Sequence, residues 1–92
     1  MSKVDHYKII VHGRVQGVGF RYSALNMANR LGLKGYVRNM YDGSVIMEIE
    51  GPEGSIDKMI YWCKQGFGPG HVKDVELTQD AVVNYTSFEL RY

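Results

Sequence analysis

Residues 7–32 decide the expected fold, and their sequence is YKIIVHGRVQGVGFRYSALNMANRLG. From Tyr7 to Val11 every second residue is aromatic or aliphatic, which is the two-residue period of a β-strand. The segment that follows holds three glycines in seven residues and shows no periodicity. Such a segment is typical of a loop and not of the interior of a helix or strand. The sequence therefore predicts a strand over 7–12 and a loop over 13–19.

The period changes at Phe20, where apolar side chains begin to recur at helical spacing. This apolar face comprises Phe20, Ala24, Leu25, Ala28 and Leu31. Gly32 follows the last member and is a helix stop signal. The sequence therefore predicts a helix that begins at Phe20 and ends before Gly32.

The rest of the chain also alternates between segments of strand period and segments of helix period. Asp42-Gly43 is a turn signal between two strand-like segments, and Gly66 ends a second helical segment. The apolar face of that second helix contains Ile56, Met59, Ile60 and Cys63. The further predicted strands cover 33–39, 44–50, 72–78 and 87–91.

The expected order of elements is strand, helix, strand, strand, helix, strand, with a short strand added at the end. This is the split βαβ, or ferredoxin-like, arrangement of the α+β class. It is a βαββαβ two-layer sandwich with a mostly antiparallel sheet and two helices on one face. Because this architecture hosts enzymes, metabolite sensors and RNA-binding modules, function has to be inferred from the site.

The composition indicates an ordinary globular protein, and 92 residues suffice for a single domain over 1–92. A formal net charge of +1 lacks the basic excess that is usual in nucleic-acid-binding domains. With no apolar run of about 18 residues and no charged-then-apolar N-terminus, we expect neither a membrane span nor a signal peptide. Cys63 is the only cysteine, which excludes an intrachain disulfide. We expect a cytoplasmic monomer without a nucleic-acid or membrane partner.

The glycine-rich loop and the start of the first helix together favour anion binding. Glycines allow backbone N–H groups to form a concave nest, and a helix start adds unpaired N–H groups and a positive dipole. Arg21 lies at that helix start, and its planar guanidinium can bind two phosphate oxygens at once. A glycine-rich loop alone is as often a simple connection, and Arg14 at its entrance is expected to be solvated.

Three familiar phosphate-binding motifs do not fit the sequence. A P-loop counted from Gly13 meets valine and glycine where glycine and lysine belong. A dinucleotide fingerprint counted from Gly17 places Tyr22 at a small-residue position. Cys63 lies inside a predicted helix, so nucleophilic cysteine chemistry is not expected and Cys63 is interpreted as a small hydrophobe.

Asn39 ends the predicted second strand, just before the turn. Asparagine in such a place is commonly a turn former. Its carboxamide can alternatively accept a hydrogen bond from water and donate one toward a phosphate oxygen, with no charge to repel a dianion.

The remaining polar and aromatic residues favour structural roles. The three histidines, His6, His12 and His71, show neither metal-ligand spacing nor a carboxylate cluster around them, so no metal site is expected. Asp42 is interpreted as part of the turn. Core or sheet-face positions are expected for the aromatic residues Tyr7, Tyr36, Tyr41, Tyr61, Trp62 and Phe67.

Two motifs carry a family resemblance that covers essentially the whole chain. Residues 13–21, GRVQGVGFR, resemble the first signature of the acylphosphatase family, and residues 35–39, GYVRN, followed by DGSV at 42–45, resemble the second. Tyr36 and Gly70 depart from the tryptophan and alanine that are common in the family.

The resemblance implies hydrolysis of small-molecule acyl phosphates to a carboxylate and inorganic phosphate, without a metal or cofactor. It implies that Arg21 binds phosphate, and that Asn39 orients the attacking water. It further implies phosphate contacts from the backbone amides of Val15, Gln16, Gly17, Val18, Gly19 and Phe20. Inorganic phosphate is then both product and inhibitor.

Two alternatives remain open. A regulatory module could hold phosphate or a phosphorylated metabolite without turnover, and it would have no use for Asn39. An RNA-binding sheet would require its aromatic residues on a central strand, whereas Phe20 and Tyr22 begin a predicted helix.

Overall fold

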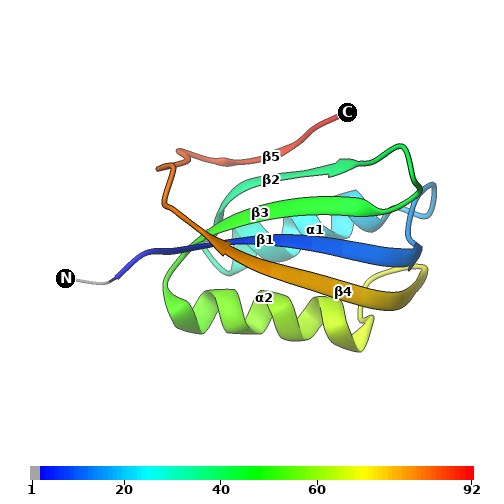
Figure 1. Cartoon of the computed structure of the whole chain (residues 1–92), viewed down its shortest axis with the longest axis horizontal. Helices are drawn as coiled ribbons and strands as arrows, with labels where there is room; N and C mark the ends of the chain where they lie inside the picture. Colours follow the sequence, from blue (N-terminus) through cyan, green and yellow to red (C-terminus); the bar gives the residue numbers. More distant parts are fainter. Residues whose placement is uncertain (1–2) are drawn as a thin grey trace.

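The computed structural model describes residues 3–92, which form a five-stranded sheet and two α-helices (Figure 1). The elements are β1 (Asp5–Arg14), α1 (Phe20–Arg30), β2 (Lys34–Asn39), β3 (Val45–Gly51), α2 (Glu53–Gln65), β4 (His71–Asp80) and β5 (Phe88–Leu90). The strand order is β4-β1-β3-β2-β5, and every neighbouring pair is antiparallel except β2 with β5. This confirms the predicted ferredoxin-like α+β fold, with β5 added beside β2.

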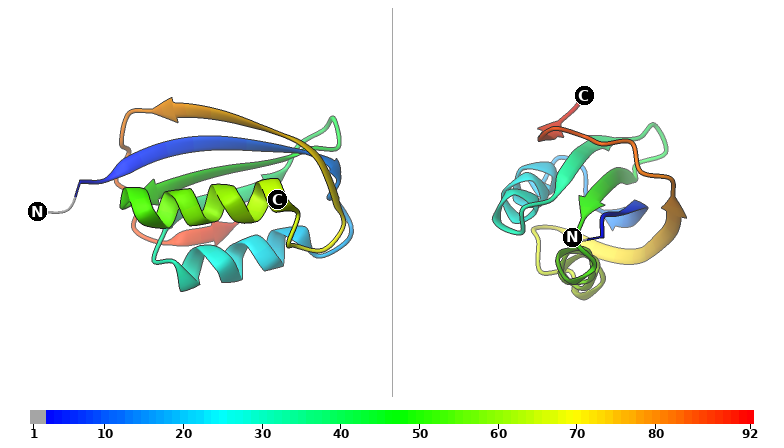
Figure 2. Two further views of the ribbon diagram at one scale, coloured as in Figure 1. Left: turned by 90° about the horizontal axis from the view of Figure 1, so that it is seen from below. Right: turned by 90° about the vertical axis from the view of Figure 1, so that its left-hand side faces the viewer.

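Both helices cover the same face of the sheet (Figure 2). α1 contacts β2 and β5, and α2 contacts β4, β1 and β3. Within residues 3–92, no helix is long and apolar enough to cross a membrane. The sheet therefore has one face covered by helices and a second face, called the outer face below, that carries no helix.

The core lies between the sheet and the helices and follows from the strand register. Ile9 pairs with Met47 and Val11 with Val45, and all four side chains are fully buried. From the helices, Phe20 of α1 lies against Trp62 of α2, with their ring centroids 5.4 Å apart. Since every second residue of β1 and β3 faces this core, the apolar residues between 7 and 11 predicted the strand correctly.

β1 is longer than predicted, and the glycine-rich loop is shorter. Gly13 and Arg14 belong to β1, where a register shift between His12 and Gly13 marks a bulge against β4. A Cβ atom on Gly13 would lie 2.2 Å from the carbonyl oxygen of His71. This glycine therefore permits close approach of two strands, and the loop begins at Val15.

The prediction of core or sheet-face positions was wrong for three aromatic residues. Tyr41 is exposed in the connection between β2 and β3, and Tyr61 and Phe67 are exposed beside each other, with ring centroids 5.8 Å apart. Trp62 and Tyr36 are buried as predicted. Aromatic identity alone does not distinguish the two outcomes, because turn positions and outward helix positions also tolerate aromatic side chains.

The close approach of β2 and β3 yields a testable prediction at Gly35. Its φ angle is +140°, and a Cβ atom there would lie 1.8 Å from the carbonyl oxygen of Glu48. We expect Gly35→Ala to lower the free energy of unfolding by about 2–3 kcal/mol or more, because the two backbones must separate. Urea denaturation measures this change.

Gly54→Ala is the matched control for that substitution. Gly54 lies in α2, and an added Cβ atom there would meet nothing within 4 Å. We expect it to raise the free energy of unfolding by about 0.4–1 kcal/mol. Equal denaturation midpoints for the two variants would contradict the interpretation of Gly35.

Candidate active site

The loop before α1 faces the end of β2 across a pocket of about 270 Å³. The lining residues are Val15, Gly17, Gly19, Phe20, Arg21, Tyr22 and Asn39. Arg21 and Asn39, which two separate segments of the sequence had indicated as site residues, therefore share one pocket. Gln16 and Val18 do not line it, and Tyr22 lines it although it had no predicted role there.

Glycine geometry shapes the loop at the pocket. Gly17 and Gly19 adopt left-handed conformations with φ angles of 74° and 84°. Gly19 is the N-cap of α1 and offers no side chain to cap the helix. The first helical hydrogen bond runs from the N–H of Ser23 to the carbonyl of Gly19 at 3.1 Å. The N–H groups of residues 20–22 therefore have no acceptor inside the helix.

The electrostatics of this helix start suit an anion. The first turn of α1 contains no acidic residue, so no side-chain charge there offsets the positive end of the helix dipole. Arg21 adds a cation in the same turn. A phosphate group in the pocket can accept hydrogen bonds from both sources.

Two buried residues fix the loop to the core. Val15 and Phe20 flank the loop and are each 1% exposed. Because Phe20 is also the first residue of α1, its burial sets where the helix begins. That helix start also excludes Phe20 and Tyr22 from a central strand, where an RNA-binding sheet would need them.

Gln16 joins the loop to the turn between β2 and β3. Its Nε2 donates to the carbonyl of Met40 at 2.7 Å and to that of Ser44 at 2.8 Å. Met40 directly follows Asn39, so these bonds link the loop to the strand end that carries Asn39. The family resemblance predicts a role for the backbone amide of Gln16 alone. Its side-chain role was not predictable from the local sequence because the partners lie 24 and 28 residues away.

Asp42 and Ser44 form the local hydrogen bonds of that turn. Asp42 Oδ1 accepts from the backbone N–H of Ser44 at 2.9 Å and from its hydroxyl at 2.6 Å. The Ser44 hydroxyl and the Ser44 N–H hold the pKa of Asp42 below its usual value. Asp42 therefore has the structural role that the sequence predicted.

Asn39 is the last residue of β2 and pairs with Val45. Its Oδ1 is buried and accepts no hydrogen bond from any residue that the structure describes. A buried acceptor without a partner is unfavourable and calls for an explanation. Asp42 and Ser44 supply the side-chain hydrogen bonds of the turn, so turn formation does not explain why an asparagine occupies position 39.

The guanidinium of Arg21 contacts the last two residues of the chain. Its Nη1 donates to the carbonyl oxygen of Arg91 at 2.8 Å, and its Cζ lies 4.8 Å from the ring centroid of Tyr92. No local pattern predicted these contacts. Arg14, the other arginine near the loop, is exposed as expected.

The one cysteine takes no part in the pocket. Cys63 is fully buried in α2, and burial raises the pKa of its thiol to about 12. The thiol therefore keeps its proton at neutral pH and packs as a small apolar group.

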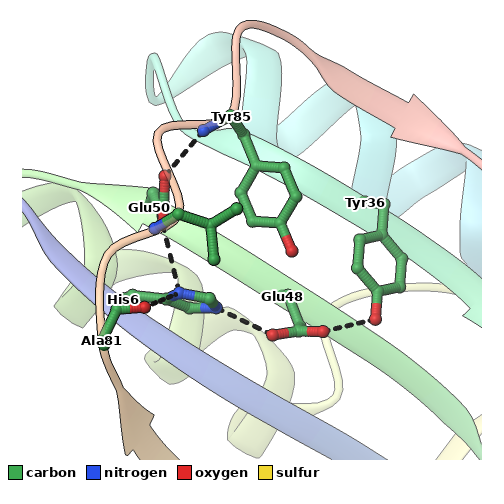
Figure 3. Close-up of polar contacts among 7 residues, drawn as sticks. His6, Tyr36, Glu48, Glu50, Ala81 and Tyr85 are labelled. Carbon is green, nitrogen blue, oxygen red and sulfur yellow. Dashed lines mark hydrogen bonds and ion pairs between the residues drawn. The ribbon is translucent and has the colours of Figure 1, made fainter.

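A second polar cluster occupies the outer face of the sheet (Figure 3). His6 of β1 hydrogen-bonds Glu48 of β3 through Nε2 at 2.8 Å, and the Tyr36 hydroxyl of β2 donates to the other Glu48 oxygen. Burial, followed by the Glu48 carboxylate, raises the pKa of Tyr36 to about 12, so the phenol remains a donor. Glu50 accepts from the backbone N–H groups of Val83 and Tyr85.

The expectation that no carboxylates surround the histidines was wrong for His6. One ligand atom each from His6, Glu48 and Asp80 lies within 4.8 Å of the others. Both ring nitrogens are already engaged, however, since Nδ1 also contacts the carbonyl of Ala81 at 2.8 Å and Glu50 at 3.1 Å. The cluster therefore ties the connection between β4 and β5 to the sheet. No local pattern predicted this cluster, because its members come from different strands.

Comparisons with known proteins assign the chain to a family. The Acylphosphatase family model matches residues 7–90. An acylphosphatase from Acaryochloris marina is 41% identical over 90 residues, which cover 98% of this chain and 97% of the relative. One from Archaeoglobus fulgidus is 44% identical over 85 residues, which cover 92% and 96% of the two chains.

The fold agrees with these matches. The crystal structure of acylphosphatase from Bacillus subtilis superposes with a TM-score of 0.90 at 35% identity, covering 98% of this chain and 100% of that one. The glycine-rich loop, the paired signature segments and the five-stranded sheet thus occur together in a chain that matches acylphosphatases along nearly its whole length, and it belongs to the acylphosphatase family.

Proposed function

We propose that the protein hydrolyses small acyl phosphates to a carboxylate and inorganic phosphate. The pocket between the start of α1 and the end of β2 binds the phosphate group of the substrate. The observation that carries this proposal is that Arg21, the loop glycines and Asn39 line one pocket. In this mechanism Arg21 and the backbone amides of residues 15–20 hold the phosphate, while Asn39 holds the attacking water.

The binding step uses charge and hydrogen bonds that the chain supplies itself. The Arg21 fork and the unpaired N–H groups at the α1 start stabilise the charge on the phosphoryl oxygens. Both the guanidinium and the N–H groups can stabilise a phosphate dianion, since the first turn of α1 holds no carboxylate that would compete for them. Inorganic phosphate, the product, fits the same contacts and therefore acts as an inhibitor.

The chemical step needs little more than positioning. An acyl phosphate expels a carboxylate, which is a weak base, so no strong general acid is required at the leaving oxygen. A barrier reduction of about 8–12 kcal/mol suffices for so labile a substrate. Oxyanion stabilisation by Arg21 and the amides, together with an oriented water, can supply it without a metal ion.

Asn39 supplies the water position. Its Oδ1, which has no hydrogen-bond partner among residues 3–92, can accept a hydrogen bond from the attacking water. The amide is neutral, so it does not repel the substrate dianion. The substrate phosphate then takes the proton that the water loses.

We propose further that residues 1–92 form one domain, which acts as a monomer in the cytoplasm. The single cysteine is a buried free thiol, which suits a reducing compartment. The near-neutral charge and the fully formed pocket within one chain support a monomer.

Arg21→Ala tests the phosphate contact. We expect kcat/KM for benzoyl phosphate to fall about 10³-fold or more, because one bidentate contact to the transferring group is lost. The inhibition constant of inorganic phosphate should rise with it. Arg30→Ala, which removes an exposed arginine at the other end of α1, is the control and should leave both values unchanged. Wild-type protein that binds phosphate but hydrolyses nothing would instead be a binding module.

Asn39→Ala tests the water position. We expect kcat to fall about 10²–10³-fold while the inhibition constant of phosphate stays within about threefold, because the phosphate contacts remain. Asn39→Asp keeps the shape and adds a negative charge, so it should lower phosphate affinity as well. Parallel loss of phosphate affinity and turnover in Asn39→Ala would rule out this division of roles.

Removal of divalent ions tests whether the chain's own groups suffice. We expect turnover of benzoyl phosphate to be unchanged after dialysis against EDTA, because Arg21 and the amides carry the phosphoryl charge. A loss of turnover that added Mg²⁺ or Zn²⁺ restores would contradict the proposal.

A further inference from the structure

We propose that Tyr22 is a specificity-determining residue, which contacts the acyl group of the substrate and favours acyl phosphates whose carbonyl carries an aromatic ring. The inference rests on the proposed function, because that function places the phosphate and the attacking water in the pocket. It deepens that function by naming a substrate class, and it uses a pocket residue that belongs to neither signature motif.

Helix geometry explains how an exposed residue can line the pocket. Tyr22 is the third residue of α1, and its position is about 200° around the helix axis from the buried Phe20. Its side chain therefore points away from the core and is 64% exposed. Side chains of a helix lean toward its N-terminus, so the Tyr22 ring leans toward the start of α1, in agreement with its place in the pocket lining.

Packing within the chain does not account for this ring. Tyr22 takes part in none of the aromatic or cation–π pairs among residues 3–92. Phe67 has the same exposed fraction, but its ring packs against that of Tyr61 with the centroids 5.8 Å apart. An exposed aromatic ring that lines a pocket and lacks such packing is available to a ligand.

The direction of the reaction places the acyl group on the side of Tyr22. In phosphoryl transfer the attacking and leaving oxygens lie roughly in line, on opposite sides of the phosphorus. Asn39, which holds the water in the proposed mechanism, presents a buried Oδ1 from the end of β2. Tyr22 lines the same pocket from the start of α1 and is largely exposed. A water held at Asn39 therefore directs the leaving oxygen, and the acyl group bonded to it, toward the open side of the pocket where Tyr22 lies.

The chemistry of the Tyr22 ring determines which acyl groups it favours. Aromatic rings attract one another in offset-stacked or edge-to-face arrangements, whereas a methyl group offers a much smaller contact area. One such ring pair changes affinity about threefold to tenfold. Every acyl phosphate makes the same phosphate contacts, so Tyr22 acts on the choice between acyl groups and not on the affinity for phosphate.

A comparison of two acyl groups tests the inference. We expect Tyr22→Ala to lower the ratio of kcat/KM for benzoyl phosphate to that for acetyl phosphate about threefold to tenfold. The inhibition constant of inorganic phosphate, which has no acyl group, should stay within about twofold of wild type. Tyr22→Phe keeps the ring and should retain the wild-type ratio. An unchanged ratio in Tyr22→Ala, with or without a general loss of activity, would overturn the inference.

Tyr41→Ala is the matched control for Tyr22→Ala. Tyr41 is a fully exposed tyrosine in the turn that follows Asn39, and it does not line the pocket. Its substitution removes the same side chain near the same site and should leave the ratio at the wild-type value. An equal fall of the ratio in Tyr41→Ala and Tyr22→Ala would also overturn the assignment to Tyr22.

Non-hydrolysable analogues locate the acyl group without turnover. In phenacylphosphonate and acetonylphosphonate, a CH₂ group replaces the bridging oxygen of benzoyl phosphate and acetyl phosphate. We expect wild type to bind the phenacyl compound about threefold to tenfold more tightly than the acetonyl compound, and Tyr22→Ala to bind the two equally. Nuclear Overhauser effects should connect the phenacyl ring to the Tyr22 ring protons. Their absence at saturation would contradict the contact.

Failure of the inference and failure of the proposed function have different signatures. If wild type binds both phosphonates but hydrolyses no acyl phosphate, the proposed function fails, and the preference between the phosphonates still decides the inference. If wild type hydrolyses both acyl phosphates and Arg21→Ala abolishes turnover, while Tyr22→Ala keeps the wild-type ratio, only the inference is wrong.

Discussion

Burial of Phe20 against Trp62 sets the start of α1, and the geometry of the pocket depends on it. Phe20 is the first helical residue, so its place in the core determines where the preceding glycines turn and where Arg21 emerges. Gly17 and Gly19 can follow this path because their left-handed conformations carry little steric penalty without a Cβ atom. The same apolar contact that stabilises the fold therefore places a cation and unpaired N–H groups at the pocket.

Positive and negative groups lie on different sides of the sheet. The pocket lies between the end of β2 and the start of α1, where the helix dipole is positive. The carboxylates of the partly buried Glu48 and the buried Glu50 lie on the outer face, where His6, Tyr36 and backbone N–H groups compensate their charge. A phosphate dianion therefore meets an environment without buried carboxylates among the pocket-lining residues. Arg91 contacts residues of both regions. Its guanidinium lies over the ring of Tyr36 on the outer face, and its carbonyl accepts a hydrogen bond from Arg21 at the pocket.

Element type was predictable where a local rule applies. The alternation in β1, the turn at Asp42-Gly43 and the left-handed Gly66 at the end of α2 each depend on neighbouring residues. The exceptions have nonlocal causes. Gly13 was expected in a loop but lies in β1. A glycine is needed there because β4 approaches too closely for a Cβ atom. The carboxylates around His6 were unforeseen because two of them come from β3 and one from β4.

The sequence by itself determined the βαββαβ order, the glycine-rich turn, and the presence of an arginine at a helix start and an asparagine at a strand end. Periodicity and φ preferences are properties of adjacent residues, so they can be inferred without coordinates. Only the tertiary structure decided that Gln16 bonds residues 24 and 28 positions away, and that Arg21 meets a carbonyl 70 positions away. Those partners depend on which strands pair and in which register, and the local pattern of a segment does not specify its neighbour across the sheet.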